Sequence, residues 1–168
     1  MNNLLHVGLD VGSTTVKIAV MDKDLNLLYR NYQRHFSDTK NTVCNVLEDL
    51  IKMYPDSEFT VALTGSGAMS ASKFLDLPFI QEVVACKRAV EKYIPKTDVV
   101  IELGGEDAKI IYFDKSIEQR MNGTCAGGTG AFIDQMASLL NTDTNGLNEL
   151  AKNYNMIYPI ASRCGVFA

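Results

Sequence analysis

The sequence predicts an α/β fold in which one supersecondary unit is used twice. Apolar runs of strand length alternate along the chain with longer segments of helical spacing. A first unit of three strands, a helix, a strand and a helix ends near Pro95, and VVIEL at residues 99–103 begins the same order again. We therefore expect one complete lobe at residues 1–96 and a truncated, incomplete second lobe at residues 97–168, as in a fragment of a longer protein.

The first unit opens with three strands that we expect to pair antiparallel. They are LLHVGL, VKIAVM and NLLYRNY, and the polar DKD between the last two is typical of a hairpin turn. Capping residues at 37–39 predict the start of a helix that carries apolar residues at helical spacing and stops at Pro55. The strand FTVAL, the connecting turn TGSGAM and a helix at residues 82–93 complete the unit.

The second unit is predicted in the same style. The strands are VVIEL, AKIIYF and IEQRM, separated by the turns GGED and DKS. A helix follows from Gly128, and a shorter helix follows from Asn145.

Composition and charge narrow the classes of function. The chain is 46% hydrophobic and 21% charged, which is ordinary for a packed protein. Its 16 basic and 20 acidic side chains give a net charge of -4, and the basic residues are scattered, which argues against a nucleic-acid partner. We find neither a signal peptide nor an apolar run of the ~18 residues that a membrane span needs, so we expect a cytoplasmic protein. Four cysteines in a reducing compartment favour packing, redox chemistry or metal binding over disulfides.

The first glycine turn, in GLDVGSTTVKIAV, is suited to binding phosphate. Small residues between two strands let backbone N–H groups converge, and hydroxyl side chains add donors. A lysine on the second strand adds positive charge, and an aspartate at the end of the first strand is suited to hold a water of hydrated magnesium. The residues of this candidate site are Asp10, Gly12, Ser13, Thr14, Thr15 and Lys17. The alternative is a plain hairpin with a glycine turn, since a Walker A pattern is absent.

The second glycine turn recurs at the same place in the second unit. Gly104 and Gly105 follow a strand, and Glu106 and Asp107 lead into the next one. Two such turns would hold a nucleotide from opposite lobes, with Glu106 orienting a water and Asp107 binding magnesium. The alternative is a surface turn with solvated carboxylates.

Two cysteines stand in glycine-rich settings that suit metal ligands. Cys125 lies in NGTCAGGTGAFIDQM, before a predicted helix whose N-terminus favours a thiolate, and Cys164 lies in SRCGVFA. A two-fold dimer would supply the four thiolates that an iron–sulfur cluster generally takes. From spacing alone, two buried structural cysteines are the alternative. Cys44 and Cys86 lie on predicted helices among apolar residues, which favours core packing.

Taken together, these motifs resemble the ATP-dependent activators of 2-hydroxyacyl-CoA dehydratases and the related ATPase subunits of benzoyl-CoA reductases, the BadF/BadG/BcrA/BcrD-type ATPases. The resemblance spans the whole chain. It is carried by DVGSTTVK, LGGEDAK, NGTCAGGTGAFID and SRCGVFA, among which Cys-Ala-Gly-Gly-Thr-Gly is the most discriminating run.

The resemblance implies an actin-like ATPase fold of the ribonuclease H-like type, in which two lobes close on ATP and Mg²⁺. It implies a homodimer that shares one 4Fe-4S cluster, ligated by Cys125 and Cys164 of each chain. Such an ATPase uses ATP to pass a low-potential electron to a CoA-thioester dehydratase or reductase component, and reduced ferredoxin or flavodoxin is the implied donor. Glu106 stands where many short activators have Gln, and the run around Cys125 is closer to the large, multidomain relatives.

Two other functions would use the same phosphate turns. One is a sugar or carboxylate kinase of the same fold, which would need a carboxylate side chain as the base for its substrate and would not need paired cysteines. The other is a non-enzymatic actin-like or Hsp70-like module in which ATP controls assembly. Neither accounts for the setting of Cys125 as well as an electron-transferring ATPase does.

Overall fold

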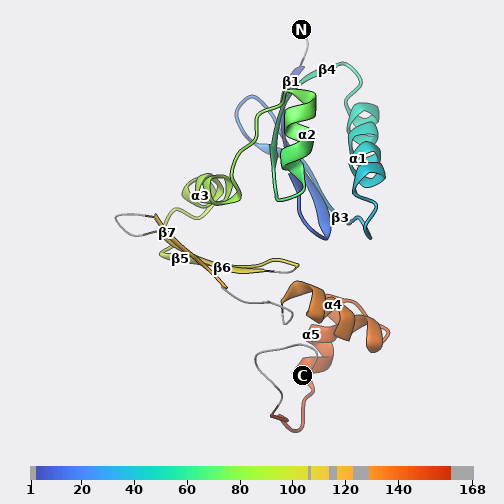
Figure 1. The fold of residues 1–168 in the computed structure, drawn as a ribbon, viewed down its shortest axis with the longest axis vertical. Helices are drawn as coiled ribbons and strands as arrows, with labels where there is room; N and C mark the ends of the chain where they lie inside the picture. Colours follow the sequence, from blue (N-terminus) through green and yellow to red (C-terminus); the bar gives the residue numbers. More distant parts are fainter. Residues whose placement is uncertain (1–2, 106, 114–116, 123–128, 160–168) are drawn as a thin grey trace. The chain divides into compact units, whose positions relative to one another are not determined.

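The computed structural model describes residues 3–105, 107–113, 117–122 and 129–159. The chain forms two compact units, Met1–Pro95 and Lys96–Ala168, which are described separately here. Figure 1 shows the order of the helices and strands along the chain. In the described part of the chain, no helix has the length and apolar character that crossing a membrane requires.

A four-stranded sheet forms the centre of the first unit, with the strand order β3-β2-β1-β4. The strands are β1 Asn3–Val11, β2 Thr15–Met21, β3 Leu27–Arg34 and β4 Ser57–Thr64. β1 pairs antiparallel with β2, β2 pairs antiparallel with β3, and β4 joins β1 in parallel. The predicted antiparallel start is therefore confirmed, and the parallel fourth strand needs the intervening helix as its crossover.

The first unit also contains α1 Thr39–Met53, which lies between β3 and β4 in the chain, and α2 Ala68–Leu75 and α3 Glu82–Tyr93, which follow β4. The capping prediction for α1 is confirmed, because the Asp38 carboxylate accepts a hydrogen bond from the Asn41 amide at 3.4 Å. The prediction of a simple connecting turn at TGSGAM was incomplete, because α2 begins there at Ala68. This helix has only 8 residues and no side-chain cap, so its sequence carries little helical signal.

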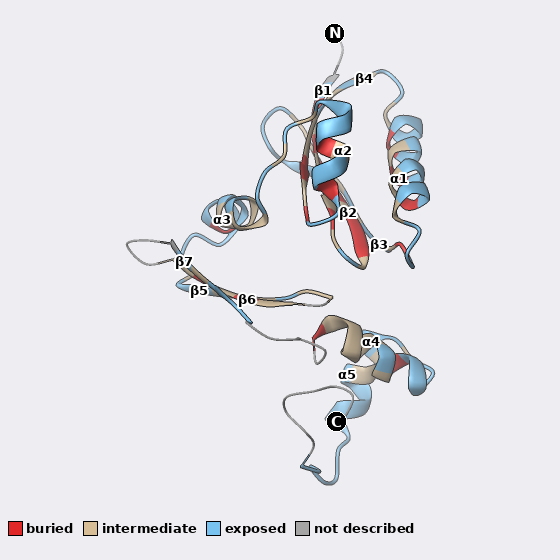
Figure 2. Ribbon diagram, viewed as in Figure 1, coloured by how far each residue is buried: buried red, intermediate tan, exposed pale blue. Residues whose placement is uncertain are grey.

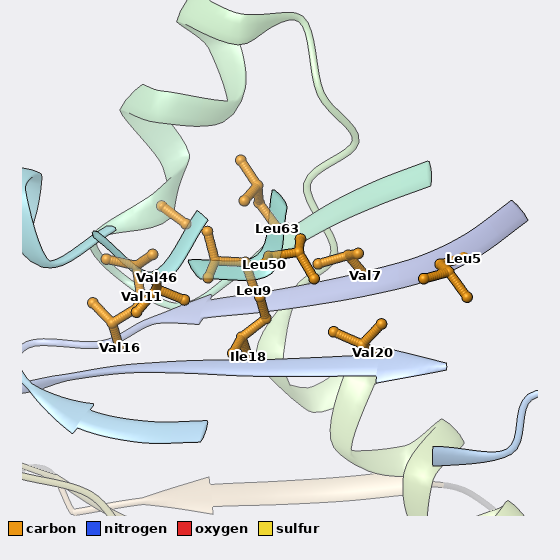
Figure 3. Packing of buried hydrophobic residues seen from close by; sticks show 11 residues of the cluster. Leu5, Val7, Leu9, Val11, Val16, Ile18, Val20, Val46, Leu50 and Leu63 are labelled. Carbon is orange, nitrogen blue, oxygen red and sulfur yellow. The ribbon is translucent and has the colours of Figure 1, made fainter. Parts of the chain in front are cut away.

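The core of the first unit lies on one face of its sheet. Alternate residues of β1 and β2 point to that face, and α1 and α2 cover it (Figures 2 and 3). The buried apolar cluster contains Leu5, Val7, Leu9, Val11, Val16, Ile18, Val20, Val46, Leu50, Leu63 and Ala68.

The cysteines of this unit differ in burial. Core packing was wrong for Cys44, which is exposed. It stands two positions before the buried Val46, and a spacing of two places side chains on nearly opposite sides of a helix. Cys86 on α3 is partly buried, as expected for a residue that packs.

The second unit contains the three-stranded antiparallel sheet β5-β6-β7 and two helices. The strands are β5 Val99–Leu103, β6 Ala108–Phe113 and β7 Ile117–Met121, which are the ranges predicted from the sequence. The helices are α4 Gly130–Leu139 and α5 Thr144–Lys152. The predicted start of the first helix at Gly128 lies outside the described residues. α5 begins one residue before the predicted position, because the Asp143 carboxylate accepts a hydrogen bond from the Gly146 amide at 2.7 Å.

Candidate functional site

Two hairpin turns with the same closing hydrogen bond occupy equivalent places in the two units. In the β1–β2 turn the Gly12 amide donates to the Thr15 carbonyl at 2.9 Å, and in the β5–β6 turn the Gly104 amide donates to the Asp107 carbonyl at 2.8 Å. In both turns the bond joins residues three positions apart, and the second strand begins at the acceptor residue or directly after it. The two turns that the sequence places at the same point of each unit therefore share one closing hydrogen bond.

Beside each turn, an acidic residue on the first strand lies opposite a lysine on the second strand. Asp10 is the register partner of Lys17, and Glu102 is the register partner of Lys109. Directly opposed side chains of an antiparallel pair lie within contact distance, so opposite charges at these positions stabilise the hairpin. Sequence reasoning had assigned no role to Glu102 or Lys109.

The first pair is open to solvent. Lys17 Nζ lies 2.8 Å from Asp10 Oδ2, and the Lys17 and Asp10 side chains are 41% and 29% exposed. The ammonium group also lies 5.6 Å from the centre of the Tyr32 ring, on the next strand. An exposed pair of this kind contributes little to stability, which leaves both groups available to a charged ligand.

The loop after β4 packs against the Asp10 carboxylate. Asp10 is the register partner of Thr64 on β4, and the Gly67 amide donates to the Val11 carbonyl at 2.8 Å. Gly65 has a φ of 96°, and a Cβ there would overlap the Val11 carbonyl oxygen and Asp10 Oδ1. The TGSGAM turn, which sequence analysis treated as a plain connection, thus forms one wall around Asp10.

A buried hydroxyl next to Asp10 fits a hydrated ion or phosphate group. Among the described residues, Thr64 Oγ1 is a buried side-chain oxygen without a hydrogen-bond partner in the protein. Such a group costs free energy unless a water or ligand satisfies it. The donors of this region, a carboxylate and hydroxyls, are those that hydrated Mg²⁺ and phosphate take. The residues present therefore fit magnesium and a nucleotide phosphate.

The second pair is less exposed. The Lys109 side chain is 8% exposed, and its Nζ lies 3.1 Å from Asp107 Oδ2 and 3.6 Å from Glu102 Oε1. The Asp107 carboxylate folds back over the turn, where a Cβ on Gly104 would overlap its Oδ1. Asp107, predicted as a magnesium ligand, is thus held by a lysine in this structure.

The start of α4 is hydrogen-bonded to the second turn. The Gly130 amide donates to the Gly104 carbonyl at 3.0 Å, and the Ala131 amide donates to the Gly105 carbonyl at 3.0 Å. The Thr129 hydroxyl donates to the same Gly105 carbonyl at 3.1 Å. Because the first amides of a helix lack partners within the helix, the turn carbonyls satisfy two of them. Those two amides are therefore not available to stabilise a Cys125 thiolate.

The predicted site residues fall into three groups. Those in the β1–β2 hairpin are Asp10, Gly12, Ser13, Thr14, Thr15 and Lys17, and those in the β5–β6 hairpin are Gly104, Gly105 and Asp107. The predicted water-orienting Glu106 and the predicted cluster ligands Cys125 and Cys164 lie outside the described residues. Within the described ranges, no group of three or more His, Cys, Asp or Glu side chains could hold a metal ion.

Comparison with known proteins gives several relatives along almost the whole chain. Identity to the (R)-2-hydroxyglutaryl-CoA dehydratase activating ATPase of Acidaminococcus fermentans is 30%, over 99% of this chain and 65% of the relative. Identity to the 2-hydroxyisocaproyl-CoA dehydratase activator of Clostridioides difficile is 32%, over 96% of this chain and 62% of the relative. The chain thus spans a little less than two thirds of the length of these relatives.

Solved structures show the same similarity. The activator of the 2-hydroxyisocaproyl-CoA dehydratase from Clostridium difficile, with bound ADPNP, has a TM-score of 0.81 at 30% identity, covering 97% of this chain and 62% of that one. Component A of the A. fermentans (R)-2-hydroxyglutaryl-CoA dehydratase has a TM-score of 0.78 at 26% identity, covering 98% of this chain and 64% of that one.

The paired hairpin turns and these structural matches define the class: the chain has an α/β actin-like ATPase fold, of which it spans a part. Residues 7–168 match the BadF/BadG/BcrA/BcrD ATPase family. The chain belongs to this family, as the sequence resemblance predicted.

Proposed function

We propose that the chain is part of an ATP-dependent activator that passes a low-potential electron from a 4Fe-4S cluster to a CoA-thioester dehydratase or reductase component. Family membership supports the ATPase part, and the names of the relatives support a dehydratase as the acceptor. One observation carries the proposal furthest. The carbonyls of the second phosphate turn hold the first residues of α4, the helix that follows the Cys125 run.

The first turn binds phosphate in this proposal. The Gly12 amide closes the turn, and the backbone amides of residues 13–15 and the hydroxyls of Ser13, Thr14 and Thr15 donate to phosphate oxygens, as successive amides of a turn do for anions. Lys17 Nζ, 2.8 Å from Asp10 Oδ2, adds a positive charge close to the turn. Asp10 orients a water of hydrated Mg²⁺, with Thr64 and Gly65 packed around the carboxylate. That a relative binds ADPNP supports this assignment.

The second turn places the groups proposed for hydrolysis. The Gly104 amide closes this turn, so the peptide between Gly104 and Gly105 brings the Gly105 amide to the phosphates, and Glu106 orients the attacking water. Lys109 holds the Asp107 carboxylate in place, with Nζ at 3.1 Å from Oδ2. Asp107 then serves magnesium through its remaining oxygen lone pairs.

The contact between the second turn and α4 is proposed to transmit nucleotide binding. Each turn carbonyl belongs to the same planar peptide as the amide of the next residue, so an amide that turns toward phosphate turns the carbonyl as well. The Gly104 and Gly105 carbonyls accept from Gly130, Ala131 and Thr129, so their rotation shifts the first turn of α4. A two-state helix shift of this kind is a known form of conformational coupling.

The cluster is proposed to be held between two copies of the chain by Cys125 and Cys164 of each copy. When bound, it supplies the single low-potential electron. In this arrangement α4 begins a few residues after one ligand and contacts the nucleotide turn, which connects ATP turnover to the cluster environment. Reduced ferredoxin or flavodoxin remains the proposed donor.

The test is iron content together with ATPase activity in the complete protein, purified anaerobically. We expect about four irons and four acid-labile sulfides per dimer, lost in Cys125→Ser and Cys164→Ser. Cys44→Ser is the matched control, because this thiol is exposed on α1 and outside the candidate site, and it should leave the iron content unchanged. ATPase activity in protein that binds no iron under these conditions would instead support a kinase or an assembly module.

A further inference from the structure

His35 lies directly after β3 and is buried against the first phosphate turn. His35 is 6% exposed, and the sequence analysis gave it no role. Its backbone amide donates to the Thr14 carbonyl at 3.2 Å. Its ring Nε2 lies 3.3 Å from the Gly12 carbonyl oxygen, so one residue contacts two peptides of the turn.

The hydrogen bonds of the ring fix its tautomer. The Ser37 amide donates to Nδ1 at 3.1 Å, so Nδ1 acts as an acceptor and carries no proton. A carbonyl oxygen can only accept, so Nε2 must carry the proton that it donates to the Gly12 carbonyl. Both ring nitrogens therefore have a defined partner, and the ring has one orientation that satisfies both.

The backbone after His35 adopts an uncommon conformation that makes this arrangement possible. Phe36 has a φ of 45° and Ser37 a φ of 68°, so two successive residues other than glycine lie in the left-handed region. The Phe36 side chain is 82% exposed, so burial of that side chain does not account for the conformation. The tight loop returns the Ser37 amide to Nδ1 of His35. Backbone strain of this kind persists where the surroundings require it, often beside functional sites.

We infer that His35 is a positioning residue for phosphate binding at the first turn. The Gly12 carbonyl and the Ser13 amide belong to one planar peptide and point in opposite directions. By holding the carbonyl, Nε2–H directs the Ser13 amide away from the ring, toward the side where the anion is to bind. The inference rests on the proposed ATP-binding function, because it assigns a role within that same turn.

Two substitutions distinguish the roles of the two ring nitrogens of His35. The amide of His35→Gln reaches the place of Nε2 and can still donate to the Gly12 carbonyl. The amide of His35→Asn reaches the place of Nδ1 and can still accept from the Ser37 amide. If His35 acts through Gly12, the dissociation constant for Mg-ATP should stay within about twofold of wild type in His35→Gln and rise about tenfold in His35→Asn.

The binding measurement should be made by calorimetry on the complete protein, with circular dichroism of each variant as the check on folding. Equal affinities in His35→Gln and His35→Asn would overturn the inference, because a role restricted to packing or to the loop at 35–37 does not depend on the Gly12 contact. A variant that fails to fold is replaced by a measurement on the wild type. Nitrogen NMR of the ring should find the proton on Nε2, and a proton on Nδ1 would also overturn it.

A second NMR measurement, of the Ser13 amide, distinguishes failure of this inference from failure of the proposed function. If the wild-type protein does not bind Mg-ATP, the proposed function is wrong. The position of His35 can still be decided from the Ser13 amide resonance. That resonance should match the wild type in His35→Gln and shift in His35→Asn, and identical spectra of the two variants would overturn the positioning role.

Discussion

The two glycine turns have the same internal hydrogen bond but are supported by different parts of the chain. The carbonyls of the first turn accept from His35, which lies just after a strand of the same sheet. Those of the second turn accept from the first residues of α4. The equivalent carbonyls, of Gly12 and Gly104, therefore bond to a side chain in one unit and to the start of a helix in the other.

This difference indicates a division of roles between the turns. The His35 ring, in a tight loop, holds the Gly12 carbonyl without connecting that carbonyl to a helix, and α2 contacts this hairpin at the Val11 carbonyl, which accepts from the Gly67 amide at 2.8 Å. A helix start that is hydrogen-bonded to its turn moves with it as one body, because the helix is stiff along its length. We therefore expect the first turn to bind and position phosphate. We expect the second turn to bind phosphate and also to shift α4 when it does so.

The largest effect is expected from Gly65→Ala in the first unit. Gly65 has a φ of 96°, and a Cβ would overlap the Val11 carbonyl oxygen and the Asp10 carboxylate. Both the backbone strain and the overlap with a backbone atom must be relieved, so we expect the free energy of unfolding to fall by about 3 kcal/mol. Urea denaturation of the complete protein measures this change.

Gly8→Ala is the control for this substitution. Gly8 lies on β1 as well, but a Cβ there has no atom within 4 Å, so stability should change by less than about 0.5 kcal/mol. If Gly65→Ala were equally mild, the loop after β4 would not hold Asp10 as the structure describes.

The second prediction compares the glycines that meet each turn. A Cβ on Gly130 would lie 2.7 Å from the Gly104 carbonyl oxygen, whereas a Cβ on Gly12 would lie no closer than 3.5 Å to any atom outside its chain neighbours. Gly130→Ala should therefore separate α4 from the second turn and cost about 2 kcal/mol. Gly12→Ala should cost less than about 0.5 kcal/mol in the protein without nucleotide.

Hydrogen exchange checks the location of this effect. In Gly130→Ala, the amides at the start of α4 should exchange faster than in the wild type, because their acceptors on the turn are displaced. Unchanged exchange at Gly130 and Ala131 positions would contradict a rigid contact between turn and helix.

The third prediction compares the two lysines. Lys109, 8% exposed, neutralises two carboxylates, so Lys109→Met leaves Glu102 and Asp107 without it. The carboxylates are 40% and 34% exposed, and solvent screens them in part, so we expect a loss of about 1.5 kcal/mol. Lys17→Met removes a more exposed pair and should cost less than about 0.5 kcal/mol. Equal losses of the free energy of unfolding in urea denaturation would mean that the burial of Lys109 does not make its ion pairs more stabilising than that of Lys17.

The sequence predicted the strands and both turns because these features repeat locally. Apolar residues at alternate positions predicted the strands from β1 to β7, and glycines between strands predicted the turns at Gly12 and Gly104. The same reasoning missed α2, which is too short for its helical period to be recognised. It also placed Cys44 in the core, because apolar neighbours in sequence do not reveal which side of a helix a residue occupies.

The residues that support the turns could not be found in this way. His35, Thr64 and Lys109 each act through a partner that is distant in sequence or set by strand register. A single histidine after a strand has no periodic signal, and nothing local indicates that its ring meets Gly12. A signal for Lys109 did exist, since residues 102 and 109 repeat the spacing of residues 10 and 17 once the two hairpins are aligned.

The smallest effect concerns a third turn, between β2 and β3, which is stabilised by its own side chain. Asp22 accepts hydrogen bonds from the Asn26 side chain at 2.9 Å and the Asn26 amide at 2.8 Å, and from the Asp24 amide at 2.9 Å. These bonds, led by that of the Asn26 side chain, hold the pKa of Asp22 below its ordinary value of 3.8. The lowered pKa means that its stabilising contribution is fully present above pH 3.8 and is lost as the pH falls through the lower, folded value. NMR titration of the carboxyl carbon should therefore give a midpoint below 3.8 in the wild type and a higher one in Asn26→Ala. A midpoint that Asn26→Ala leaves unchanged would show that the Asn26 side chain does not lower the pKa of Asp22, and that the backbone amides of residues 24 and 26 hold this turn without it.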